Sequence, residues 1–323
     1  MKQAKSVTKP LYGPVAKGSG GIEAPSEARD VVKQSPAGAK EAQPSKPRGG
    51  PRGGRIVTAI ALLVVTFAVF ACGDWGVLLL LLALCVVGCD EAACMVKSSV
   101  RWRFTTVMFG LAWMGWLCRE MPPNNSLYTL CLGFLMITWS FTALDAFLSP
   151  RPMPQAQGNF PSLVAPVLYI ATGLATLYAL WHHGGFAFTC VLLAAWAHDS
   201  LAYVCGRLYG RHPMCPHISK GKTWEGLAGG TLGALAILMG VWASRHHLPW
   251  LAEDPVGFLA ALGLSIGCVT GAVLGDLVES KFKRACGVKD SSQLLPGHGG
   301  VLDRIDGLIA SAMFAWVWLH WGA

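Results

Sequence analysis

The sequence predicts an all-α membrane protein with several transmembrane helices and a polar N-terminal tail. Of its 323 residues, 53% are hydrophobic and only 14% are charged. Soluble domains carry about 25% charged residues. Apolar runs recur from residue 56 to the C-terminus, many of them long enough to cross a bilayer as a helix. Most of the chain is therefore expected to lie in a membrane.

The first 54 residues are predicted to form a disordered, basic tail in the cytoplasm. They are rich in Pro, Gly, Ser, Ala, Lys and Glu and nearly lack large apolar side chains, so they cannot offset the entropy lost on ordering. No apolar stretch precedes Ile56, which argues against a secretory signal. The RGGPRGGR segment at 48–55 would also suit RNA binding. A basic collar that contacts anionic membrane lipids is the favoured interpretation, so no specific nucleic-acid partner is expected.

The remainder, residues 55–323, is predicted to form one membrane domain of about nine transmembrane helices. A helix needs about 20 residues to cross the hydrocarbon core. The predicted spans are 56–72, 75–93, 104–118, 126–148, 162–181, 184–206, 225–244, 255–278 and 305–322. An odd number of spans places the two termini on opposite sides of the membrane.

The distribution of Lys and Arg predicts which loops face the cytoplasm. With the tail inside, only Arg119 and Arg245 of the 26 Lys and Arg residues fall on the opposite side. Cytoplasmic loops carry an excess of these residues, which strongly favours this orientation. It places two polar loops, 207–224 and 279–304, on the face where nucleoside triphosphates are found.

Glycines recur along two of the predicted spans and indicate close helix packing. The first ridge, at strict four-residue spacing, comprises Gly263, Gly267, Gly271 and Gly275. The second comprises Gly226, Gly229, Gly230 and Gly233. Small residues let helix backbones approach closely, which would hold Asp276 in a fixed place. The same ridges are compatible with a homodimer.

The stretch from residue 276 to 306 combines three kinds of residue that phosphate chemistry uses. The acidic ones are Asp276, Glu279, Asp290, Asp303 and Asp306. The cationic ones are Lys281, Lys283, Arg284, Lys289 and Arg304. A Pro-Gly-His-Gly-Gly loop follows at 296–300. Carboxylates hold divalent metals, cations neutralise phosphates, and glycine lets backbone approach a ligand. The combination predicts phosphoryl or nucleotidyl transfer at a membrane surface.

Helical spacing places Asp276, Glu279, Ser280 and Lys283 on one helix face. A solvated helix end with a Glu279–Lys283 pair is the simpler explanation, but ionisable residues at the membrane boundary are functional candidates. Asp303 is expected to meet Asp276 across the hairpin with a metal between them, because adjacent carboxylates repel. A favourable helix dipole would also explain acids at the start of the last helix.

The loop between these helices supplies Lys289, Asp290 and His298. A lone histidine is more often structural than catalytic. Three glycines surround His298, however, and such a backbone can wrap an anion. The loop is therefore a candidate phosphate-binding segment.

A second polar segment spans residues 198–226. Asp199 lies near the end of its predicted helix, where a carboxylate needs a partner, a water-filled cavity or a metal. Ser219, Lys222 and Thr223 come just before the next helix, whose N-terminus can bind phosphate. The excess of positive charge in cytoplasmic loops explains part of this pattern, but it explains Lys222 less well.

Both segments resemble the signature of the phosphatidate cytidylyltransferases, the CDP-diacylglycerol synthases. The downstream motifs are SKFKR at 280–284, KDSS at 289–292, LPGHGG at 295–300 and LDRID at 302–306. The upstream motifs are DSLAY at 199–203 and KTWEG at 222–226. The resemblance covers 199–306. It departs at 219–223, where family members usually have Ser-Pro-Lys-Lys-Thr, and at Gly307, where serine is common.

The resemblance implies that CTP and phosphatidate react to give CDP-diacylglycerol and pyrophosphate, using a divalent metal. Mg²⁺ is the expected cofactor; another divalent metal or an additional monovalent cation such as K⁺ stays open. A phosphate monoester with a second pKa of about 6 is largely ionised and needs no strong base. The difficulty is the repulsion between two anionic substrates, which a metal ion and Lys or Arg groups reduce.

The expected roles divide the site residues into three sets. The expected metal ligands are Asp276 and Asp303, followed by Asp199 and Asp306. The expected catalytic residues, which act on the phosphates, are Lys283, Arg284, Lys289, Asp290 and His298. The expected substrate-binding residues are Ser219, Lys222, Thr223, Ser280 and Arg304.

Two other functions stay open from the sequence. A CTP-dependent polyprenol or lipid kinase would also need basic loops, Asp and Mg²⁺, but would release CDP in place of pyrophosphate. An anion transporter would suit the intramembrane Asp199, but no convincing internal repeat accompanies it. The expected location is the inner (cytoplasmic) membrane of a bacterial cell, with the tail and the site in the cytoplasm.

Overall fold

The computed structural model describes residues 64–65, 68–120, 136, 144, 160–216, 218–252, 256–295 and 299–321. Several predictions fall outside the described residues: the tail 1–54, most of the span 56–72, nearly all of the span 126–148, and His298.

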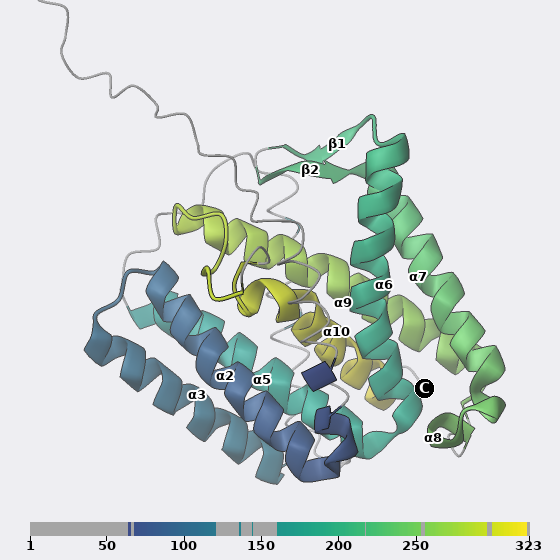
Figure 1. The fold of residues 1–323 in the computed structure, drawn as a ribbon, viewed down its shortest axis with the longest axis horizontal. Helices are drawn as coiled ribbons and strands as arrows, with labels where there is room; N and C mark the ends of the chain where they lie inside the picture. The colour runs from purple at the N-terminus through teal and green to yellow at the C-terminus, as the bar shows by residue number, and fades with distance from the viewer. Residues whose placement is uncertain are drawn as a thin grey trace, which may run out of the picture. The chain divides into compact units, whose positions relative to one another are not determined.

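Long α-helices make up most of the described chain (Figure 1). They are α2 (Gly73–Met95), α3 (Val100–Glu120), α5 (Phe160–His183), α6 (Gly185–Tyr209), α7 (Trp224–Ser244), α9 (Phe258–Ala285) and α10 (Leu302–Trp321). Two short helices, η1 (Arg245–His247) and α8 (Pro249–Ala252), lie between α7 and α9 in the sequence. The predicted helical class is confirmed.

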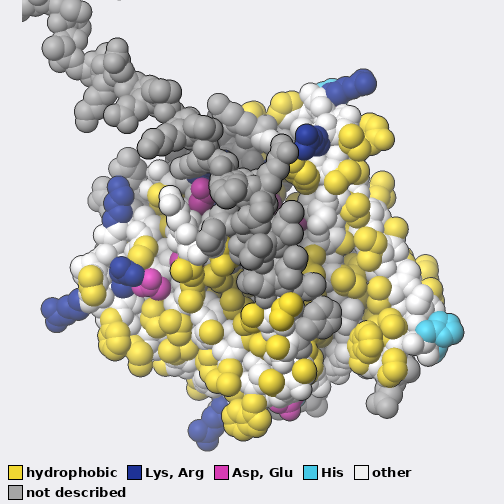
Figure 2. All heavy atoms as spheres, in the orientation of Figure 1, with side chains coloured by type: hydrophobic (Ala, Val, Ile, Leu, Met, Phe, Trp, Pro, Cys, Tyr) yellow, Lys and Arg dark blue, Asp and Glu magenta, His cyan; other side chains and the backbone are white. Residues whose placement is uncertain are grey.

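In the part of the chain that the structure describes, five helical segments are long and apolar enough to cross a membrane. They are Gly73–Met95, Leu163–His183, Gly185–Tyr209, Trp224–His247 and Phe258–Ala285. The protein is therefore a multi-pass helical membrane protein. On the face in Figure 2, hydrophobic side chains cover much of the helical surface and Lys and Arg lie mainly at its edges, as expected for helices that face lipid. The total of nine spans stays a prediction.

A short β-hairpin joins α6 to α7. Strands β1 (Pro213–Cys215) and β2 (Ser219–Thr223) pair antiparallel, with Cys215 opposite Ser219. Strand β2 occupies the segment that lacks the family's usual proline, a residue that cannot donate a backbone hydrogen bond to a strand ladder. The Thr223 side chain then accepts a hydrogen bond from the Gly226 amide at 3.1 Å and caps α7.

Helix α10 contacts α2, α5, α6 and α9 and lies between the α2–α3–α5 group and the α6–α7 pair (Figure 1). Two buried hydroxyl groups fix its position. Tyr169 on α5 donates to the Asp306 carbonyl at 2.9 Å, and Ser311 donates to the Cys268 carbonyl on α9 at 2.7 Å. These bonds join three helices next to the segment that carries the acidic motif.

The predicted glycine ridge on α9 is packed tightly against α10 at three of its four positions: Gly263 lies against the Trp318 side chain, and Gly271 and Gly275 lie against the α10 backbone. A Cβ atom at Gly271 would lie 2.7 Å from the Ser311 Cα, and one at Gly275 would lie 2.5 Å from the Asp306 carbonyl oxygen. Only glycine permits this approach of two backbones. The contact places Asp276, the next residue on α9, beside the start of α10.

We expect Gly271→Ala to destabilise the protein, because the added Cβ would meet the Ser311 backbone. Overpacking of this kind costs about 1–3 kcal/mol, which should appear as a lower thermal unfolding temperature in detergent. Gly267→Ala, on the same ridge, is the matched control, since its Cβ would lie 3.8 Å from its nearest neighbour, the Phe314 carbonyl oxygen. Equal stability of the two variants would contradict the packing described here.

Candidate functional site

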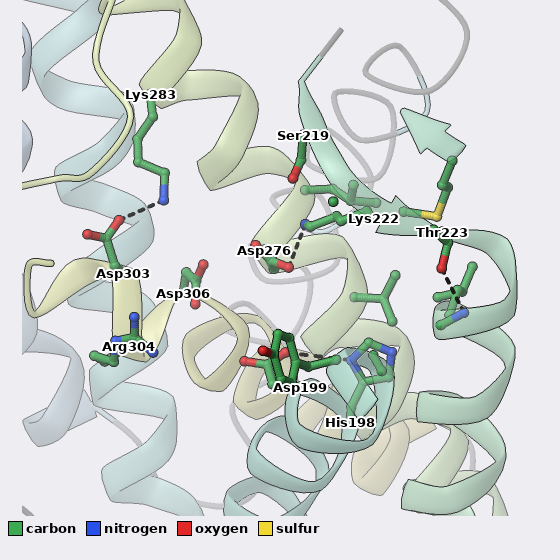
Figure 3. A pocket seen from close by; sticks show the side chains of 18 of the residues that line it. His198, Asp199, Ser219, Lys222, Thr223, Asp276, Lys283, Asp303, Arg304 and Asp306 are labelled. Atoms are coloured by element: carbon green, nitrogen blue, oxygen red, sulfur yellow. Dashed lines mark hydrogen bonds and ion pairs between the residues drawn. The ribbon is translucent and has the colours of Figure 1, made fainter. Parts of the chain in front are cut away.

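A cavity of about 410 Å³ lies between α6, the β-hairpin, α9 and the start of α10 (Figure 3). It brings together residues from both predicted polar segments. The predicted site residues that line it are Asp199, Ser219, Lys222, Thr223, Asp276, Lys283, Asp290, Asp303, Arg304 and Asp306. Segments separated by up to about a hundred residues therefore form one site, as the motifs predict.

An ion pair joins the hairpin to α9 inside the cavity. The Lys222 Nζ atom lies 2.5 Å from the Asp276 Oδ2 atom. The Ser280 hydroxyl, one turn further along α9, donates to the Asp276 Oδ1 atom at 3.3 Å. Both oxygens of Asp276 thus have a partner, and Lys222 joins the hairpin to α9.

A second ion pair joins α9 to α10. The Lys283 ammonium donates to the Asp303 Oδ1 atom at 2.6 Å and also pairs with buried Glu279, one turn earlier on α9. The Asp303 Oδ2 atom accepts hydrogen bonds from the amides of Gly300 at 2.8 Å and Ser291 at 3.0 Å. Asp303 therefore connects three segments through one carboxylate.

Asp303 lies ahead of the apolar part of α10. Burial opposes its ionisation, but the hydrogen bond and charge of Lys283 and the amide donors of Gly300 and Ser291 hold the pKa of this carboxyl below its usual range. Asp303 is consequently an anion at neutral pH.

The cavity wall carries more acidic than basic groups. Its carboxylates are Asp199, Asp276, Asp290, Asp303 and Asp306, and its Lys and Arg residues are Lys222, Lys283 and Arg304. Carboxylate oxygens are ligands that suit Mg²⁺. An excess of carboxylates repels a phosphate ligand unless cations bind with it. The donor chemistry thus fits a divalent metal. As the side chains stand, however, no group of three or more His, Cys, Asp or Glu in the described residues is arranged to hold one.

Three predicted site residues, Ser280, Arg284 and Lys289, are not among the residues that line the cavity. Ser280 supports Asp276, and Lys289 is exposed. The Arg284 guanidinium donates to the carbonyls of Ile218 at 2.9 Å and Val288 at 3.1 Å. Arg284 therefore ties the hairpin and the following loop to the end of α9.

Sequence reasoning missed Glu91, a buried residue of α2 that anchors the 291–302 loop. The Ser292 hydroxyl donates to its carboxylate at 2.6 Å and the Ser291 hydroxyl at 3.1 Å. The amides of Leu302 and Val301 donate to it at 2.8 Å and 3.0 Å. One carboxylate thus accepts four hydrogen bonds and caps the N-terminus of α10. The available signal was a pair of acidic residues, Asp90 and Glu91, at the end of the otherwise apolar span 75–93.

The glycines of the LPGHGG motif make this anchoring sterically feasible. Gly299 has a φ of +86°, which favours glycine, and a Cβ atom there would lie 2.6 Å from the Asp303 Oδ2 atom. A Cβ atom at Gly300 would lie 2.7 Å from both carboxylate oxygens of Glu91. These two glycines thus let the backbone approach the protein's own carboxylates.

The fold and the site define a class of protein: a multi-pass membrane protein with a cavity where carboxylates and Lys or Arg groups of two motifs meet. Comparison with known proteins gives the family. Residues 53–321 match the cytidylyltransferase family, so the chain belongs to it. The resemblance inferred from the motifs is confirmed.

Three relatives illustrate the similarity. The chain is 37% identical to the phosphatidate cytidylyltransferase of Haemophilus influenzae over 183 residues, which cover 56% of this chain and 62% of the relative. It is 43% identical to that of Mycobacterium leprae over 131 residues, which cover 40% of this chain and 39% of the relative. It is 32% identical to that of Brucella abortus over 265 residues, which cover 80% of this chain and 89% of the relative. The matched segment thus spans less than two-thirds of the first two relatives and most of the third.

We expect Glu91→Gln to loosen the 291–302 loop, because an amide cannot accept all four hydrogen bonds. Loss of hydrogen bonds to a buried charged group costs about 1.5–3 kcal/mol, and hydrogen–deuterium exchange at the amides of Ser291, Val301 and Leu302 should accelerate.

Asp90→Asn is the matched control for this variant, since Asp90 is the neighbouring acid and pairs with Arg103 at 2.6 Å on α3 instead. It should leave exchange in the 291–302 loop unchanged. Unchanged exchange in Glu91→Gln, or the same acceleration in both variants, would show that Glu91 does not anchor the loop.

Proposed function

We propose that this protein is a phosphatidate cytidylyltransferase, which converts CTP and phosphatidate into CDP-diacylglycerol and pyrophosphate for phospholipid synthesis. The observation that carries the proposal is the convergence of both family motifs on one cavity at the end of the apolar helices. Its wall presents Lys222, Lys283 and Arg304 to a phosphate-bearing ligand. Family membership and the names of the relatives support the same reaction.

The reaction is an in-line displacement at phosphorus. A phosphate oxygen of phosphatidate attacks the α-phosphorus of CTP, a new P–O bond forms, and the bond to the β-phosphate bridging oxygen breaks to release pyrophosphate. The nucleophile is largely ionised at neutral pH, so it needs no strong base. Catalysis therefore depends on holding two polyanions together and stabilising the departing pyrophosphate.

The described side chains suit this task. Lys222 and Lys283 reach the cavity from the hairpin and from α9, and Arg304 reaches it from α10. We assign to them the neutralisation of the CTP and phosphatidate phosphates. The Ser219 hydroxyl and the N-terminal amides of α7 would donate further hydrogen bonds to these phosphates. Arg284 and Glu91 act indirectly in this proposal by holding the hairpin and the loop in place.

Asp276 and Asp303 would hold Mg²⁺, with Asp306 as a further or outer ligand. Asp199 lies beside His198, on the other side of the cavity from Asp303 (Figure 3), so the metal role expected for it from the sequence is not part of this proposal. The bound ion would supply positive charge at the reacting phosphates. Lys222 and Lys283 now occupy these carboxylates, so this assignment requires both ammonium groups to turn to the substrate phosphates. The excess of carboxylates in the wall supports it.

The finer expectations for location and assembly follow from the sequence. We propose an inner-membrane protein with the tail and the cavity facing the cytoplasm, where CTP is available, and with phosphatidate arriving from the bilayer. The positive-inside distribution supports this orientation. A homodimer stays a prediction.

The purified protein, given radiolabelled CTP, phosphatidate and Mg²⁺, should transfer label to the lipid phase and release an equal amount of pyrophosphate. Chelation of divalent ions should stop both. CDP as the nucleotide product, with a lipid alcohol as the acceptor, would support the lipid kinase in its place. Binding of an anionic substrate without turnover would support a transporter.

We expect Asp276→Asn and Asp303→Asn to lower kcat by at least about 100-fold, the scale seen when a group that stabilises transition-state charge is removed. Asp90→Asn, which changes an acid outside the cavity, is the control and should keep its activity. Because Asp303 also bonds the loop, membrane insertion and thermal stability must be measured alongside. An active, metal-dependent Asp303→Asn enzyme would exclude Asp303 as a metal ligand.

A further inference from the structure

His198 on α6 is a buried polar residue whose hydrogen bonds are unmade. It is 7% exposed, and neither ring nitrogen has a hydrogen-bond partner among the described residues. Its nearest charged neighbour is Asp199, whose Oδ1 atom lies 3.6 Å from the His198 Nδ1 atom. That distance is too long for a hydrogen bond. Since buried polar groups are nearly always hydrogen-bonded, this imidazole needs an explanation.

The imidazole lines the same cavity as the site residues. Figure 3 shows His198 and Asp199 on one side of the cavity and Lys283 and Asp303 on the other, with the Lys222–Asp276 pair between them. A ligand that fills the cavity would therefore extend from the Lys and Arg residues to His198. Such a ligand could supply the missing hydrogen-bond partner.

Helix packing fixes the backbone that carries His198. A Cβ atom at Gly230 on α7 would lie 2.9 Å from the His198 carbonyl oxygen, and one at Gly226 would lie 2.8 Å from the Ala202 carbonyl oxygen. The two helices can approach this closely only because glycine occupies both positions on α7. His198 is thus held in place by a rigid helix pair, as a binding residue requires.

The chemistry of this side of the cavity differs from that of the other side. A neutral imidazole offers one donor and one acceptor, while an ionised carboxylate accepts only. The Asp199 side chain is 67% exposed and close to His198, so its charge disfavours a phosphate there. The pair suits an uncharged polar group that can both donate and accept hydrogen bonds.

Resting on the proposed function, we infer that His198, with Asp199, binds the nucleoside part of CTP. The nucleoside carries ribose hydroxyls and an exocyclic amino group as donors, and a keto oxygen and a ring nitrogen as acceptors. Phosphatidate, beyond its phosphate, offers ester oxygens that only accept, so it has no donor for Asp199. The triphosphate then lies toward Lys222, Lys283 and Arg304, where the reaction takes place.

His198→Leu tests this inference, because leucine has similar bulk and no polar atoms. We expect the KM for CTP to rise about tenfold, corresponding to loss of about 1.4 kcal/mol of binding, with the KM for phosphatidate within about twofold of the original. The thermal unfolding temperature without ligand should stay equal or rise, since an unpartnered buried polar group is removed. A purely structural histidine would leave both KM values unchanged.

Comparing CTP with dCTP and UTP as substrates shows which group of the nucleoside His198 and Asp199 contact. dCTP lacks the ribose 2′-hydroxyl, and UTP replaces the amino group of the base with a keto oxygen. If His198 and Asp199 bind the nucleoside, the preference for CTP over at least one of these nucleotides should shrink in His198→Leu. His198→Gln, which keeps a donor and an acceptor, should restore part of the preference.

His320→Leu, a change of the same chemistry at the far end of α10, is the control and should leave every KM unchanged. If His198→Leu does not fold, His198→Met serves for the same comparison, since its flexible side chain fits irregular spaces. An unchanged KM for CTP, a change confined to phosphatidate, or unaltered nucleotide preferences would each overturn the inference.

Thermal stabilisation by CTP separates this inference from the proposed function. Failure of the original protein to label lipid would refute the proposed reaction. A rise in unfolding temperature with CTP that is weaker in His198→Leu would still support nucleoside binding. If CTP stabilises both proteins equally, the nucleoside assignment fails while the reaction can stand.

Discussion

The close approach of α9 and α10 is the constraint on which the site depends. Gly271 and Gly275 let the two backbones meet near Ser311 and Asp306, and this contact brings Asp276 on α9 beside the start of α10. With larger residues there, the helices would separate by the width of a side chain, and Lys283 could not reach Asp303. Backbone packing in the apolar part of the protein thus sets the geometry of its polar part.

Much of the helical fold could be predicted from the sequence, because bilayer thickness sets the length of the apolar helices. The predicted span 184–206 became α6 and 225–244 became α7 with shifts of a few residues. Boundaries shifted most where a helix continues past the membrane. The span ending at 278 extends to Ala285, since its polar last turns keep helical spacing and Lys283 finds partners in Glu279 and Asp303.

The lining of the site was also predictable, because its residues lie in two compact motifs. The residues that hold these motifs in place could not be predicted, since each acts through a contact between segments far apart in the chain. Glu91 lies 200 positions before its partner Ser291, and Arg284 lies 66 positions after Ile218. No local sequence pattern predicts such pairs. Arg284 looked like a phosphate ligand by its charge, but the structure shows its guanidinium on backbone carbonyls.

The two internal ion pairs of the cavity have a thermodynamic consequence. Lys222 pairs with Asp276, and Lys283 pairs with Asp303. Under the proposed function, each lysine that turns to a phosphate leaves its carboxylate ready to accept a cation. Nucleotide and metal binding would then be linked, and by reciprocity each would strengthen the other. The two ion pairs give Asp276 and Asp303 a nearby positive charge, which lowers the cost of holding these two carboxylates close to a bilayer.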